Sequence, residues 1–309
     1  MKRPFLPFLL GCLALLPPGC GAQRDFQMGG GGATLIPAAE ALSKHDLSGA
    51  DSRLEEALRG KLPPDDRAMA ERMLATLAWR FRGDPGQAEL HFARALAVPA
   101  GRSWTFSEMA RMETAQGSFD RARESALAAV ASAQGEVDVV RAATALGRAA
   151  VERASRARLA GESLARPDSL ALVEALGELR PLVQARAGLM APSRVQVTAA
   201  LLLDDGPDAL AGWRSYYLLA TGDPRSGPLA EPRRALEALL PRWAGRGATR
   251  AQRAALVRAL AASRMFDEAA LVALDPRVPA AERVDGDPEV RAILAYAGFC
   301  RRVRDVSDA

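Results

Sequence analysis

The amino-acid sequence predicts an all-α fold in which antiparallel helix pairs stack into a solenoid. Hydrophobic residues make up 49% of the chain but aromatic residues only 5%, so alanine and leucine must fill the core. Such a core suits closely packed helices, because alanine is the best helix former and lets backbones approach. Patterns typical of strands are nearly absent. Within residues 74–133, a turn followed by an alanine recurs with Ala88 and Ala122 34 residues apart. A fixed period of this length predicts a repeat architecture.

Residues 1–19 have the composition of a secretory signal peptide. A basic start precedes an apolar run that ends at Leu16 and is too short to span a bilayer as a stable anchor. The sequence LLPPGC, which ends at Cys20, resembles the lipobox of bacterial lipoproteins, in which a small residue precedes a cysteine that becomes diacylated. Gly19 fits this pattern, whereas the two prolines depart from it. The resemblance implies lipidation of Cys20. Ordinary signal-peptidase cleavage near Ala22 and a retained anchor are the alternatives.

The remaining cysteines and the next glycines agree with an anchored chain. If Cys20 carries lipid and Cys12 is removed with the signal peptide, Cys300 is left alone and no disulfide can form. Residues 20–35 contain four successive glycines, which predict a flexible tether. A phosphate-binding loop is excluded there, because no Lys-Ser/Thr pair follows the glycines and no strand precedes them.

Residues 36–134 are predicted to hold the most regular helix pairs. Asp84 precedes Pro85 as a helix N-cap precedes a proline in the first turn, and Thr105 with Glu108 forms a capping box that is predicted to open the next unit. The helices expected before these signals cover residues 38–44, 49–62 and 65–82.

Residues 135–188 and 189–309 depart from this regularity. The first segment is predicted to be an atypical hairpin of helices over 136–164 and 168–187. The second is predicted to hold divergent repeats, with a turn at 204–207 and a capping box from Thr249 to Gln252. A terminal helix from Asp287-Pro288 through Arg304 is expected to cap the solenoid.

Within the regular part, the chain resembles the tetratricopeptide-repeat family. Ala88, Phe92 and Pro99 match the small residue, aromatic residue and proline of the family's second helix. The copy at Ala122 keeps the register without the aromatic residue, and Glu113 occupies a position where the family has tyrosine. The resemblance implies a right-handed superhelical solenoid whose concave side accepts a peptide or helix of a protein partner.

Charge and motifs argue against catalysis and nucleic-acid binding. The 41 basic and 37 acidic residues give a net charge of only +4, without the basic face that nucleic acid requires. His45 and His91 have no ligands at metal-binding spacing and are predicted to lie at the surface or at a groove edge. Three aspartate pairs, at 65/66, 204/205 and 285/287, are interpreted as helix caps. No motif predicts an enzyme, a metal site or a cofactor.

Two clusters are candidates for partner contact. Trp213, Tyr216 and Tyr217 share one helix face, on which core packing is favoured for Trp213 and an exposed contact for Tyr217. An arginine arc around Trp243 could receive an acidic partner or lipid headgroups, and a solvated face is the competing interpretation. The arc consists of Arg242, Arg246, Arg250 and Arg253.

The sequence therefore predicts a lipid-anchored helical-repeat scaffold that binds protein partners during assembly or maintenance of a cell-envelope complex. Gly21 after Cys20 favours the periplasmic face of the outer membrane, by resemblance to lipoprotein sorting. One alternative is a periplasmic solute-binding or transporter-associated repeat protein, with the aromatic residues of 204–217 enclosing a small solute. A third hypothesis is an enzyme whose active-site residues are distant in sequence.

Overall fold

All regular structure in the described residues is helical, as predicted. The computed structural model describes residues 33–99, 101–185, 189–221, 230–242 and 248–308; in 33, 217–221, 230–231, 242 and 303–308 the description covers the backbone alone. These residues form fourteen α-helices and three short 3-10 helices, with no strand among them. None of the described helices has the length and apolar character needed to cross a bilayer.

The helices follow one another with short connections. In chain order they are α3 (Ile36–Ser43), α4 (Leu47–Arg59), α5 (Pro64–Phe81), α6 (Pro85–Leu96), α7 (Arg102–Ala115), α8 (Phe119–Ala131), α9 (Glu136–Leu159), α10 (Arg166–Ala185), α11 (Met190–Leu203), α12 (Gly206–Thr221), α13 (Ala230–Leu239), α14 (Arg250–Ala262), α15 (Phe266–Ala273) and α16 (Pro288–Asp308). The 3-10 helices are η1 (Ala33–Leu35), η2 (Leu240–Arg242) and η3 (Ala280–Glu282).

Several helix starts agree with the predicted caps. The Asp84 carboxylate accepts a hydrogen bond from the Gln87 amide at 2.9 Å at the start of α6. Both bonds of the capping box between Thr249 and Gln252 form at the start of α14. The Asp287 carboxylate accepts from the amides of the first turn of α16. Side chains here satisfy amides that a helix end leaves without intrahelical partners.

Several predicted boundaries are wrong. The helix expected over 49–62 ends at Arg59, and the helix expected to end at Arg304 continues to Asp308. The Thr105 box does not open a helix, because α7 already begins at Arg102 and the Thr105 hydroxyl donates back to the Gly101 carbonyl at 3.2 Å within the first turn. Helix α9 ends at Leu159 rather than at residue 164, because Gly161 adopts a φ of +82° that ends the helix.

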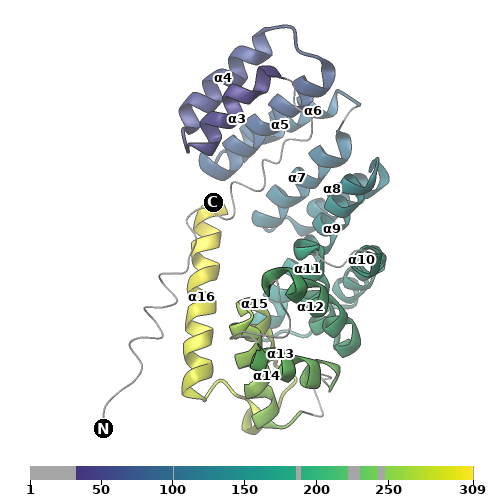
Figure 1. The fold of residues 1–309 in the computed structure, drawn as a ribbon, viewed down its shortest axis with the longest axis vertical. Helices are drawn as coiled ribbons and strands as arrows, with labels where there is room; N and C mark the ends of the chain where they lie inside the picture. Colours follow the sequence, from purple (N-terminus) through teal and green to yellow (C-terminus); the bar gives the residue numbers. More distant parts are fainter. Residues whose placement is uncertain (1–32, 100, 186–188, 222–229, 243–247, 309) are drawn as a thin grey trace, which may run out of the picture.

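The helices form two layers along most of the chain (Figure 1). Helices α5, α7, α9 and α11 contact one another in succession, and each also packs against the helix that follows it, α6, α8, α10 or α12. Close approach within this array depends on small residues. A Cβ added at Gly212 of α12 would lie 3.0 Å from the Ser193 carbonyl oxygen of α11. The two backbones therefore meet at that glycine.

The last helix does more than cap one end. Helix α16 packs against α14 and α15, and it also contacts α5, so it runs back along the array toward the first helices (Figure 1). Its 21 residues give a length of roughly 30 Å. The prediction of a terminal helix is confirmed, but its position differs, because it joins helices from both ends of the described chain.

Candidate functional site

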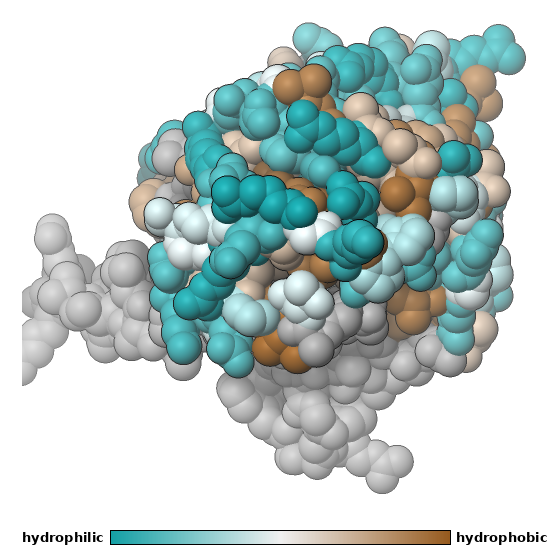
Figure 2. Space-filling view, turned by 90° about the horizontal axis from the view of Figure 1, so that it is seen from above, coloured by the Kyte–Doolittle hydropathy of each residue, from teal (hydrophilic) through white to brown (hydrophobic). Residues whose placement is uncertain are grey.

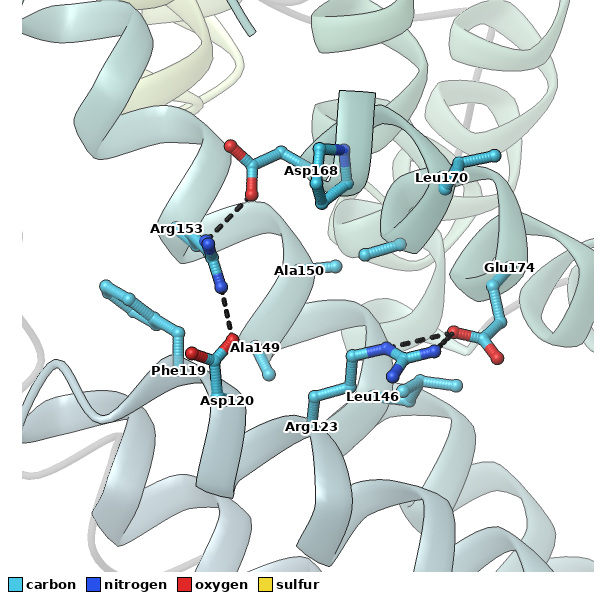
Figure 3. A pocket seen from close by; sticks show the side chains of 12 residues that line it. Phe119, Asp120, Arg123, Leu146, Ala149, Ala150, Arg153, Asp168, Leu170 and Glu174 are labelled. Atoms are coloured by element: carbon cyan, nitrogen blue, oxygen red, sulfur yellow. Dashed lines mark hydrogen bonds and ion pairs between the residues drawn. The ribbon is translucent and has the colours of Figure 1, made fainter. Parts of the chain in front are cut away.

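A groove of about 430 Å³ lies between α8, α9 and α10. Its floor is apolar and consists of the buried side chains of Leu146, Ala149 and Ala150 on α9 together with the partly buried Ala171 on α10. Figure 3 shows α8 and α10 on either side of this floor, with charged side chains around it. Its volume falls near the lower end of the range for binding pockets, so it has room for one or two side chains.

Two sets of ion pairs connect the walls of the groove. The Arg123 guanidinium of α8 lies 2.7 Å from the Glu174 carboxylate of α10. Arg153 of α9 lies 2.6 Å from Asp120 of α8 and 2.7 Å from Asp168 of α10. Most of these groups are exposed, so each pair adds little stability, but together they place hydrogen-bonding groups around an apolar floor (Figure 3).

Helix α10 carries two exposed apolar side chains, of which Leu170 lines the groove. Leu170, which lines the groove, is 59% exposed, and Val173 is 54% exposed one helical turn away. By contrast, in the view over the end formed by α3 to α6, hydrophobic residues appear as separate areas among hydrophilic ones (Figure 2). The α8–α10 groove therefore combines an apolar floor, an exposed leucine and a polar rim.

The structure describes the side chains of two of the predicted contact residues, Trp213 and Arg250. Cys20 and Arg246 lie outside the described residues, as do the side chains of Tyr217 and Arg242. Trp213 is 1% exposed and belongs to the core formed by α11 to α16, which is the core packing favoured for it and leaves no ring surface for a partner.

Only one described member of the arginine arc lies at the surface. Arg250 is exposed at the start of α14. Arg253 is 0% exposed and donates toward the Glu282 carboxylate at 3.4 Å. The interpretation of the arc as a solvent-facing basic surface is therefore wrong at Arg253, because that side chain is covered by packed neighbours although it lies one helical turn from the exposed Arg250.

The prediction for the histidines holds for one of them. His45 is exposed, but His91 is buried, and its Nδ1 lies 2.7 Å from Glu71 Oε2 on α5. Its Nε2 lies 3.2 Å from Gln87 on the preceding turn. The surface prediction is wrong at His91, because α5 supplies a partner 20 residues away that no motif indicates.

Aspartates at helix junctions behave partly as predicted. Asp205 accepts from the Asp208 amide at 3.1 Å, as a cap does. Its neighbour Asp204 instead forms an ion pair with Arg277, which also bonds to Asp275. Burial by itself raises the pKa of Asp275, but hydrogen bonds from Arg277 outweigh it and the net shift is downward. This cluster ties the α11–α12 turn to the segment after α15.

Sequence reasoning missed the groove. Its ion pairs join residues as far as 51 positions apart, and its floor consists of one leucine and three alanines, residue types that are common throughout the chain. Within the described residues, no three His, Cys, Asp or Glu side chains gather in a way that could hold a metal ion.

Comparisons of the chain with protein-family models, with curated proteins and with solved structures find no match.

Proposed function

We propose that this protein is a lipid-anchored helical-repeat scaffold that binds a protein partner during assembly or maintenance of a cell-envelope complex. The observation that carries the proposal is the α8–α10 groove, whose apolar floor and paired charges suit an inserted apolar side chain of a partner. The groove is small, so we propose a peptide or helix as its occupant rather than a folded domain surface.

The arrangement of the helices supports this scaffold. We propose that the successive pairs α5–α6, α7–α8, α9–α10 and α11–α12 are divergent tetratricopeptide-like repeats of a right-handed solenoid. Their neighbouring first helices and the 34-residue interval from Ala88 to Ala122 support this proposal. Such an array carries side chains on rigid helices, which lowers the entropic cost of presenting a binding surface.

Anchoring at the periplasmic face of the outer membrane is the second part of the proposal. Its support is the lipobox-like sequence at Cys20 and the glycine-rich tether of residues 20–35. A flexible tether would let the helical body reach a partner near the membrane surface while a lipid fixes its location.

The test combines crosslinking in cells with affinity purification of the full chain. Leu170→Glu places a charge beside the apolar floor, and Leu90→Glu, at a residue 55% exposed on α6, is the matched control. We expect one envelope complex to copurify with the wild type and with Leu90→Glu, and its recovery to fall at least about tenfold with Leu170→Glu, which corresponds to about 1.4 kcal/mol. Equal recovery with both variants would exclude the groove as the partner site.

The same experiment addresses the anchor through Cys20→Ala. We expect this variant to move from the membrane fraction to the soluble fraction, because the lipid has no other attachment site in the proposal. A Cys20→Ala variant that remains in the membrane fraction contradicts lipid anchoring, whatever happens to partner recovery.

A further inference from the structure

Arg72 on α5 is a buried cation without a carboxylate partner. It is 6% exposed, and its Nη1 lies 3.4 Å from both the Gly101 carbonyl oxygen and the Thr105 hydroxyl, which are long contacts. Its Nε is buried and has no hydrogen-bond partner among the described residues. Arg253, which is also buried, differs in having the Glu282 carboxylate 3.4 Å away.

Burial makes this charge costly. The pKa of Arg72 is lowered to about 10, first because burial removes water from the guanidinium and second because Arg141 carries a like charge nearby. The group still carries its charge at neutral pH. A buried charge is normally retained only where an opposite charge or several strong hydrogen bonds compensate for lost hydration.

The nearest carboxylates are occupied elsewhere. Glu108 bonds to Arg111 at 2.8 Å, and Asp138 bonds to Arg141 at 3.0 Å. Neither of these carboxylates, nor that of Asp65, forms an ion pair with Arg72 in the described structure, although all three act on it from farther away. The protein itself therefore leaves the Arg72 charge incompletely balanced.

A second guanidinium and an aromatic ring lie beside Arg72. The Arg72 Cζ is 4.9 Å and the Arg141 Cζ 4.1 Å from the centroid of the Trp104 ring. These three side chains come from α5, α7 and α9, which are successive helices of one layer. The ring attracts both planar cations through cation–π contacts, which oppose their mutual repulsion.

The start of α7 adds a further positive environment. Its N-cap is Gly101, which has a φ of +68° and supplies no side-chain cap, and the Ser103 hydroxyl in the first turn is buried without a partner among the described residues. A Cβ at Gly101 would lie 2.7 Å from Arg72 Nη1, so only glycine lets the guanidinium lie this close. Gly101 and Arg102 are exposed, so the cluster reaches solvent.

We propose that Arg72, Arg141, Trp104 and the amino-terminal turn of α7 form a binding site for an oxyanion, a phosphate or carboxylate group. A guanidinium offers parallel N–H donors that match the oxygens of either group, and a helix amino terminus favours negative charge. The ligand would supply the missing counter-charge of Arg72. The site is separate from the α8–α10 groove and does not depend on the proposed scaffold function.

Thermal unfolding of the full chain at constant ionic strength tests the site. We expect millimolar sodium phosphate or sodium acetate, compared with sodium chloride, to raise the Tm of the wild type by at least about 2 °C. Whichever of the two salts acts identifies the phosphate or carboxylate chemistry. Arg72→Met should lose this shift. Arg258→Met, which removes an exposed arginine paired with Asp287 and Glu289, should keep it.

A fluorescence titration provides a readout that does not depend on the stability of an Arg72 variant. Phosphate or acetate should change the tryptophan emission of the wild type, and Trp104→Phe should lose that change while its circular dichroism stays helical. The proposal is overturned if neither salt affects the wild type. It is also overturned if Arg72→Met, shown to be folded, keeps the full Tm shift, because the stabilisation would then come from general salt exclusion.

Discussion

The buried carboxylate of Glu113 lowers the stability of the fold at neutral pH. Its side chain is 2% exposed on α7, and burial raises its pKa, although the Ser125 hydroxyl and the Arg121 guanidinium act in the opposite direction. A carboxyl group whose pKa is higher in the folded protein than in the unfolded chain destabilises the fold at pH values above its folded pKa. The penalty disappears below the unfolded value of about 4.5.

We therefore expect Glu113→Gln to raise the Tm at pH 7. The gain should shrink as the pH falls and vanish below about pH 4.5, where the wild-type carboxyl is protonated in both states. Thermal unfolding between pH 4 and 8 measures this. Glu89→Gln is the control: Glu89 pairs with the same Arg121 but is exposed, so its effect should stay within about 0.5 kcal/mol. A lower Tm for Glu113→Gln at pH 7 would show that the Glu113 charge stabilises the fold, contrary to this expectation.

The surroundings of some side chains could be predicted from the sequence, and those of others could not. The cap at Asp84 depends on an amide three positions away, and the size and apolar character of Trp213 by themselves favour a core position. The partner of His91 is Glu71, and the ion pairs of Arg153 reach α8 and α10. These contacts are set by helix packing, which a single sequence does not specify.

Among the elements, helix contacts depend on where glycine occurs. Gly212 meets the backbone of α11: a Cβ at this position would lie 3.0 Å from the Ser193 carbonyl oxygen and 3.2 Å from the Val197 amide nitrogen. Gly177 on α10 is exposed, and a Cβ there would have no atom of a neighbouring element within 4 Å. The same substitution should therefore have opposite effects at these two glycines.

We expect Gly212→Ala to lower the free energy of unfolding by about 1–3 kcal/mol, because α11 and α12 must move apart. Gly177→Ala should raise it by about 0.4–1 kcal/mol, because alanine restricts the unfolded chain and favours helix. Urea denaturation of both variants measures the difference. Similar values for the two variants would show that α11 and α12 do not approach as closely as described.

Element type was easier to predict than element boundaries. The Ala- and Leu-rich composition and the 34-residue interval predict helices, and the described residues hold no strand. The start of α7 was predicted wrongly, because Thr105 and Glu108 have the spacing of a capping box. The helix begins at Arg102 instead, after Gly101, whose positive φ and not a side chain sets the boundary.

At the scale of the whole molecule, α16 links the two ends of the array. Near its middle, the Tyr296 ring packs edge-on against Phe266 of α15, with ring centroids 4.7 Å apart. Farther along, Arg301 lies 3.1 Å from Asp267, and the helix also contacts α5. The sequence of α16 is that of an ordinary terminal helix, so no pattern in it predicts the contact with α5. The position of α16 beside the array is visible only in the structure (Figure 1).

Truncation after Asp287 should therefore loosen two distant regions. We expect faster hydrogen exchange in α15, which loses Tyr296 and Arg301, and also in α5, which lies more than 200 residues away in sequence. Mass spectrometry of peptides from both helices measures this, with α9 as the internal control. Faster exchange in α15 alone would mean that the contact with α5 adds no stability.

The return of α16 to α5 also bears on the order of folding. Most helices contact their sequence neighbours and can pack as the chain lengthens, so their formation is local and fast. The contact with α5 has to wait until α16 is present, more than 200 residues later in the chain. Under the proposed export of this chain across a membrane before folding, α5 would therefore lack this contact until α16 had also crossed.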